Sequence, residues 1–125
     1  MIRIALIREV FHHDESGQLL RETLAEAKEL GATIAVLPEI PLNPWSPATR
    51  TRREDDAEPV NGPRARRQAE AASEIGIGVV GGVIEQLDDG QRRNRALVFG
   101  SDGEVLGRFA KCHIPDEPGF YEADH

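Results

Sequence analysis

The pattern that most constrains the fold is an alternation of short apolar runs with helix-like segments. Residues 2–7 (I-R-I-A-L-I) and 33–37 (T-I-A-V-L) are rich in β-branched and apolar side chains, which is typical of strands that are mostly covered. Between these runs, Leu20 and Leu24 recur at helical spacing, and Gly31 stands where a left-handed helix end favours glycine. The first third of the chain therefore predicts a strand–helix–strand unit.

The next segment repeats this unit. Pro63 suits the first turn of a helix, which is predicted to place Ala65 and Ala69 along one face and to end at Gly76. The apolar run at residues 77–84 then predicts a third strand. Because strands that are separated by helices need crossover connections, these three strands are expected to be parallel.

The last part of the chain predicts a hairpin. Turn sequences at residues 88–90 (D-D-G) and 101–103 (S-D-G) flank an apolar run at residues 96–99, and a final strand is expected over residues 104–110. The predicted order is β-α-β-α-β-β-β. This order indicates an α/β fold with a mixed sheet and helices on one face, in a single domain that covers residues 1–125.

The charge balance and composition exclude several function classes. Acidic residues outnumber basic ones 22 to 15, and the net charge of −7 argues against binding to nucleic acid or to anionic membranes. No run approaches the roughly 20 apolar residues that a membrane span needs. A single cysteine, Cys112, excludes an internal disulfide, and the first residues are too few and too charged for a signal peptide. We therefore expect a soluble cytoplasmic protein.

A long connection separates the second strand from the second helix. Residues 40–62 contain four prolines and the charged run R-T-R-R-E-D-D at residues 50–56. Loops of this length inside a compact domain are usually functional or mobile. Because the arginines are followed at once by acidic residues, we expect a solvated charged loop here rather than a phosphate site.

Two charged residues lie where strands are predicted to end. Glu39 comes two residues after an apolar run, in V-L-P-E, and Lys111 ends the final strand, in R-F-A-K. Ligands of open α/β sheets bind beyond the carboxyl ends of the strands, so both residues are candidates for a site. Either residue alone is more often a solvated surface residue. If Lys111 faces a site, its neighbour Cys112 is expected to face away, because adjacent side chains of a strand alternate.

Five motifs in sequence order give the pair more weight. They are V-L-P-E at residues 36–39, G-G-V-I-E at 81–85, R-N-R-A-L-V-F at 93–99, G-R-F-A-K-C-H-I-P at 107–115 and D-E-P-G-F-Y-E at 116–122. Together they resemble the N-terminal part of the nitrilase superfamily, the carbon–nitrogen hydrolases. The last two motifs are most similar to the N-carbamoylputrescine amidase branch.

This resemblance implies a fold and a site. The fold would be the N-terminal half of a four-layer α-β-β-α sandwich, in a domain that is incomplete at its C-terminus. In a Glu-Lys-Cys triad, Glu39 matches the general base, Lys111 matches the lysine that stabilises the tetrahedral intermediate, and Glu122 matches a glutamate that positions the substrate or the lysine. The cysteine of the family lies further along, so the resemblance implies that this chain has no nucleophile.

The resemblance also implies the partners of the chain. They are a small-molecule amide or carbamoyl amine as substrate, and either a homo-oligomer or a C-terminal complement. Thioester chemistry on an amide requires no cofactor and no metal.

Three other interpretations stay open. Cys112, His113 and Asp116 suggest a Cys-His-Asp site, although the side chains of sequence neighbours on an extended segment diverge. The H-H-D sequence at residues 12–14 suggests a metal site, although adjacent histidines rarely bind one ion and a polar loop is the simpler explanation. The missing nucleophile also allows a non-catalytic module that binds another molecule through the half-fold.

Overall fold

The computed structural model describes residues 1–44 and 53–113 of the 125-residue chain. The elements are β1 (Ile4–Leu6), α1 (Gln18–Glu29), β2 (Ile34–Val36), the 3-10 helix η1 (Glu54–Asp56), α3 (Pro63–Ile75), β3 (Gly78–Gln86), β4 (Arg92–Phe99) and β5 (Val105–Ala110). Within these ranges, no helix has the length and apolar character to cross a membrane.

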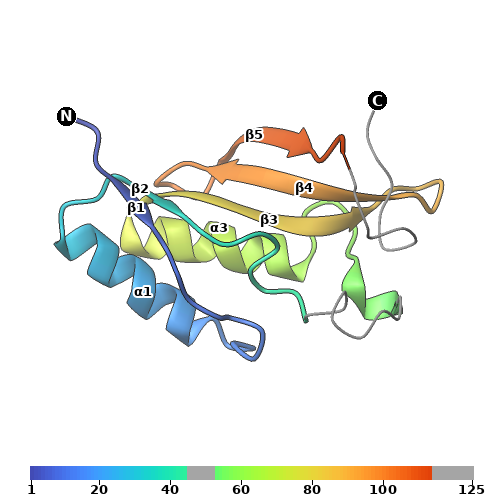
Figure 1. Cartoon of the computed structure of the whole chain (residues 1–125), viewed down its shortest axis with the longest axis horizontal. Helices are drawn as coiled ribbons and strands as arrows, with labels where there is room; N and C mark the ends of the chain where they lie inside the picture. The colour runs from blue at the N-terminus through green and yellow to red at the C-terminus, as the bar shows by residue number, and fades with distance from the viewer. Residues whose placement is uncertain (45–52, 114–125) are drawn as a thin grey trace.

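The strands form one five-stranded sheet in the order β1-β2-β3-β4-β5. The first three strands are parallel, and β4 and β5 continue the sheet as antiparallel strands. Helices α1 and α3 lie side by side against the same face of the sheet (Figure 1). The predicted element order and the α/β class with helices on one face are confirmed.

The core lies between the two helices and the sheet. Helix α1 buries Leu20 and Leu24 completely, and burial of a leucine side chain contributes about 1.5–3 kcal/mol. The sheet contributes a second set of fully buried side chains, namely Val79, Val83, Leu97 and Phe99. This packing fixes the strands whose ends carry the charged residues discussed below.

Local sequence determines where the helices begin and end. The carboxylate of Asp14 accepts hydrogen bonds from the backbone N–H groups of Leu19 and Leu20, at 3.1 and 2.9 Å, and so caps the first turn of α1. Gly31 follows α1 with a φ of 90°, and Gly76 ends α3 with a φ of 75°. Both glycines occupy the left-handed region that was predicted for them.

The face of the sheet that the helices do not cover is apolar and exposed. Ile4, Leu6 and Phe109 expose 55%, 80% and 64% of their surface. The strand register places Leu6 on the same face as Val98. The prediction that the first strand is mostly covered is therefore wrong, because α1 and α3 pack against only one of its two faces.

Two further expectations differ from the structure. Ala69 lies on the core-facing side of α3 as predicted and is half-buried there, but the polar Gln68, which was not expected in the core, is fully buried. The charged loop is also less solvated than predicted, because Asp56 is fully buried and its carboxylate accepts the N–H of Arg53 at 2.7 Å. A buried carboxylate is tolerated when it accepts such backbone hydrogen bonds.

Candidate active site

Glu39 lies just beyond the carboxyl end of β2. The strand pairing continues to Leu37, whose N–H donates to the carbonyl of Val80 at 2.8 Å, and Pro38 then ends it. Ile40 adopts a φ of +39°, which is strained for a β-branched residue, and its buried side chain packs against Ile84. This anchored turn directs the chain away from the sheet immediately after Glu39.

Lys111 directly follows β5 and reaches the same place. Its ammonium donates a hydrogen bond to Oε1 of Glu39, with an Nζ–Oε1 distance of 3.0 Å, although the two residues are 72 positions apart. The structure thus brings the two predicted site residues together. The side chain of Glu39 is 59% exposed and that of Lys111 is 30% exposed. Because exposed ion pairs contribute only about 0–1 kcal/mol, stability does not account for this pairing.

A third polar residue, Asn94 in β4, completes this cluster. Its Nδ2 donates to the same Oε1 of Glu39 at 2.7 Å, and its backbone carbonyl accepts the N–H of Lys111 at 2.9 Å. Asn94 was not among the site residues predicted from the sequence. The available signal was an asparagine between two arginines inside a strand, where asparagine is unfavourable.

The three polar side chains border a cavity of about 290 Å³. Its other walls are largely apolar and include Ile40, Val80 and Phe109. A concave apolar site with a few convergent polar groups is the usual form of a small-molecule site. A carboxylate and an ammonium at its border can move a proton and stabilise a developing negative charge.

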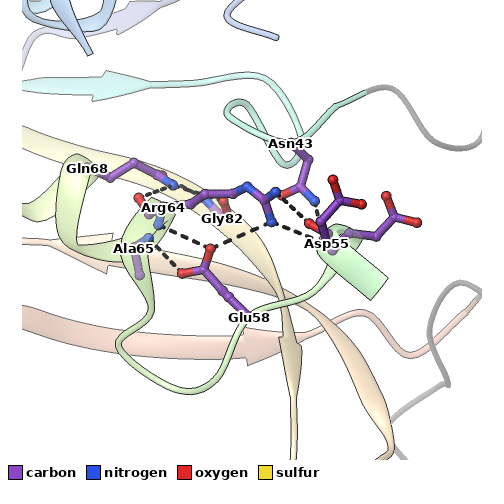
Figure 2. A network of polar contacts seen from close by, with 8 residues as sticks. Asn43, Asp55, Glu58, Arg64, Ala65, Gln68 and Gly82 are labelled. Atoms are coloured by element: carbon purple, nitrogen blue, oxygen red, sulfur yellow. Dashed lines mark hydrogen bonds and ion pairs between the residues drawn. The ribbon is translucent and has the colours of Figure 1, made fainter. Parts of the chain in front are cut away.

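The loop that begins at Glu39 is held by a polar network (Figure 2). Arg64 donates to the carbonyl of Asp55 at 2.6 Å, and the amide of Asn43 donates to the carbonyl of Asp56 at 2.5 Å. The carboxylate of Glu58 accepts the N–H groups of Arg64 and Ala65 at the start of α3, at 3.1 and 3.0 Å. These contacts attach the last part of the loop, residues 55–58, to the start of α3.

Glu58 also attaches this loop to the sheet. Its N–H donates to the carbonyl of Ile84 at 2.9 Å, and its carbonyl accepts the N–H of Gln86 at 2.7 Å. The pairing of β3 with β2 ends at Val80. Further along β3, Glu58 therefore pairs with Glu85 as a parallel backbone partner. Burial raises the pKa of Glu58, while the N–H groups of Ala65 and Arg64 and the Arg64 charge oppose this rise.

The other candidate residues lie elsewhere. Cys112 is exposed, does not line the cavity, and directs its Sγ to the carbonyl of Ala110 at 3.4 Å. His12 contacts the carbonyl of Asn43 through Nδ1 at 2.8 Å, and no group of three or more His, Cys, Asp or Glu residues within 1–44 and 53–113 is arranged to hold a metal ion. Glu122 and Asp116 lie outside the described residues.

Comparisons with known proteins define the class. A sequence model of the carbon–nitrogen hydrolase family matches residues 11–125. The chain therefore belongs to the carbon–nitrogen hydrolases, the nitrilase superfamily.

Among curated relatives, the omega-amidase of Mus musculus is 34% identical over 116 residues, which cover 91% of this chain and 41% of the relative. The omega-amidase of Xenopus tropicalis matches with the same identity and the same shares. The chain thus spans about two fifths of the length of these relatives.

Solved structures confirm the fold. A carbon–nitrogen hydrolase from Helicobacter pylori superposes with a TM-score of 0.78 at 20% identity, covering 99% of this chain and 45% of that one. A mutant of the amidase from Nesterenkonia sp. in complex with butyramide gives a TM-score of 0.76 at 22% identity, covering 99% and 49%. At these identities the likeness is evidence of the fold alone.

Proposed function

We propose that this chain contributes the base and the oxyanion-stabilising lysine to a site that hydrolyses a carbon–nitrogen bond of an amide or carbamoyl amine. The observation that supports this proposal is the contact of Glu39 with Lys111 at the border of an apolar cavity, in a chain that belongs to the carbon–nitrogen hydrolases. In this reaction Glu39 is the general base and Lys111 stabilises the tetrahedral intermediate. Glu122 remains a proposed positioning residue.

The proposed reaction needs a thiol close to Glu39. The carboxylate of Glu39 takes the thiol proton as sulfur bonds to the carbonyl carbon, and the negative charge that forms on the carbonyl oxygen faces the Lys111 ammonium. The proton then passes to the leaving nitrogen, and the C–N bond breaks to give a thioester. Water, deprotonated by the same carboxylate, cleaves the thioester and regenerates the thiol.

We propose that this thiol comes from outside these 125 residues. Cys112 is the sole cysteine of the sequence, and its Sγ is directed to a backbone carbonyl rather than into the cavity. Removal of the nucleophile from a comparable triad costs on the order of 10⁶ in turnover. The chain by itself is therefore expected to be inactive on amides.

The proposed substrates share a carbon–nitrogen bond of an amide or carbamoyl group. An unsubstituted aliphatic amide fits the apolar cavity walls at Ile40 and Phe109. A carbamoylated diamine, as in the N-carbamoylputrescine amidase branch, would add a cationic tail, which the net charge of −7 favours electrostatically. We therefore include both kinds of compound in the test.

The test combines this chain with a cysteine-bearing complement. The chain is co-expressed with the part of an omega-amidase that lies beyond the matched region, and ammonia release from butyramide and N-carbamoylputrescine is measured. We expect turnover only when both polypeptides are present, and none when the chain carries Glu39→Gln. Turnover by the chain alone that survives Cys112→Ala would contradict the proposal.

A second candidate function is an interaction module without catalysis. The exposed apolar face around Leu6 and Phe109 supports it, because an apolar sheet face of this kind is typical of a surface that another molecule covers. The same face would receive a C-terminal complement or a second copy of the chain. Both functions predict a discrete complex in sedimentation, so the ammonia assay separates them: the interaction module predicts a complex that never hydrolyses either amide.

A further inference from the structure

We propose that Asn94 is the positioning residue of this site, holding Glu39 and Lys111 in register and reserving one oxygen of the Glu39 carboxylate, Oε2, for proton transfer. This inference rests on the proposed function, because it concerns how the proposed base and lysine are held.

Asn94 contacts each of the two residues through a different group. The side-chain Nδ2 donates to Oε1 of Glu39 at 2.7 Å, and the backbone carbonyl accepts the N–H of Lys111 at 2.9 Å. The Lys111 ammonium closes the triangle on the same Oε1 at 3.0 Å. A single residue of β4, a strand with a neighbour on each side, thus contacts both residues of the pair.

Asn94 is buried, so the hydrogen bond of its amide to Glu39 is not a contact between two exposed side chains. The residue is only 5% exposed, and it lies in a β-strand, where an asparagine costs stability unless its amide is paired. The orientation of the amide follows from its partner, since a carboxylate can accept from Nδ2 but would repel Oδ1. An apolar residue would suit this position better if packing were its only role.

The consequence for the carboxylate is an asymmetry between its two oxygens. Oε1 accepts both the Asn94 amide and the Lys111 ammonium, whereas Oε2 makes no hydrogen bond within residues 1–44 and 53–113. In the proposed reaction Oε2 is then the atom that takes the proton from the thiol and returns it to the leaving nitrogen. The Lys111 ammonium stays on the Oε1 side, where it faces the developing oxyanion.

The test measures the NMR signal of the Lys111 ammonium in this chain. The sequence contains two lysines, Lys28 and Lys111, so ¹⁵N-lysine labelling gives two side-chain ammonium signals in NMR. Lys28 donates to the carbonyl of Ile75 at 2.7 Å, far along the chain from the site, and serves as an internal reference. In Asn94→Ala we expect the Lys111 signal to shift or to vanish through faster exchange with water, while the Lys28 signal stays in place.

A matched control separates positioning from general loosening. Asn43 is as deeply buried as Asn94 and also donates through its amide, but to the loop carbonyl of Asp56. Because Asn43 holds a later part of the loop that begins at Glu39, Asn43→Ala should move the Lys111 signal far less than Asn94→Ala does, and it should leave the Lys28 signal in place. If Asn94→Ala does not fold, Asn94→Leu keeps the volume without the donor and takes its place.

The outcomes are distinct. A Lys111 signal that is unchanged in a folded Asn94 variant, or one that moves equally in Asn43→Ala, would overturn the positioning role. If the signal moves as expected but the complemented chain never releases ammonia, the proposed function fails while the positioning geometry stands. The two proposals are therefore tested by separate measurements.

Discussion

The side-chain amide of Gln68 in α3 pairs with the backbone of Gly82 in β3 through two hydrogen bonds, each 3.0 Å long (Figure 2). The Gln68 oxygen accepts the Gly82 N–H, and the Gln68 nitrogen donates to the Gly82 carbonyl. This contact lies just after the last β2–β3 pair, Val36–Val80. The Gln68 amide therefore makes the backbone hydrogen bonds to Gly82 that a residue of β2 would make if the strand were longer. A side chain at Gly81 would collide with the Gln68 amide, and one at Gly82 would collide with the backbone carbonyl of Arg95 in β4.

Gln68→Leu should therefore destabilise the chain strongly. It leaves the N–H and the carbonyl of Gly82 buried and unpaired, and a loss of about 2–4 kcal/mol in the free energy of unfolding follows. Urea denaturation measures this loss. The control is Gln18→Leu, since the exposed side chain of Gln18 donates to Glu22 on the helix surface, and it should change the stability by less than about 0.5 kcal/mol. Equal effects of the two changes would contradict the role of the Gln68–Gly82 pair.

The stability contribution of Glu58 should fall as the pH rises. Burial raises its pKa above the ordinary 4.5, so its contribution is fully present below that pH and is lost as the pH rises through the folded-state pKa. The difference in unfolding free energy between the wild type and Glu58→Gln should therefore shrink over this window. Urea titrations at a series of pH values measure it, with Gln68→Leu as a control whose difference stays constant. A wild-type advantage that grows with pH would show the opposite shift.

The sequence predicted the order of the elements because local signals determined them. Glycines at 31 and 76 mark the helix ends, and the apolar runs have the length of strands. It did not predict which faces are covered, because that depends on which other layers are present. Ile4 and Leu6 look like core residues in the sequence but are exposed in the fold.

The site was only partly predictable. Their positions at strand ends made Glu39 and Lys111 candidates, but only the family resemblance paired them, since nothing local relates two residues that are 72 positions apart. Asn94, Gln68 and Glu58 were missed for a common reason. Each is a polar residue whose partner is supplied by tertiary structure, and in sequence such residues cannot be distinguished from solvated ones.

If the proposed roles hold, Glu39→Gln and Lys111→Met should strongly lower turnover without unfolding the chain. Both side chains are partly exposed, so each change should alter the unfolding free energy by less than about 0.5 kcal/mol. In the complemented enzyme, loss of the base should lower kcat by about 10²–10⁴ and loss of the oxyanion donor by about 10²–10³. Ammonia release and urea denaturation, measured on the same samples, check both expectations. A drop in activity that merely follows a drop in stability would argue for a structural role instead.

Cys112 should not act as the nucleophile of the site. Its Sγ is directed to the carbonyl of Ala110, and Cys112 does not line the cavity that Glu39 and Lys111 border, so it is not placed to attack an amide held there. Iodoacetamide should alkylate this exposed thiol, as followed by mass spectrometry, and neither alkylation nor Cys112→Ala should change the turnover of the complemented enzyme. A turnover that depends on Cys112 would restore the Cys-His-Asp interpretation.

The exposed sheet face should drive association of the isolated chain. Leu6 and Phe109 expose 80% and 64% of their surface, and burial of such side chains is favourable by about 25 cal/mol per Å² of apolar area. The double change Leu6→Ser with Phe109→Ser should therefore shift sedimentation profiles towards the monomer and weaken binding of the complement. Leu30→Ser is the matched control, because Leu30 is 70% exposed but lies at the end of α1, away from this face. If Leu30→Ser disperses the assembly as well as the double change does, association arises from general surface hydrophobicity and not from the sheet.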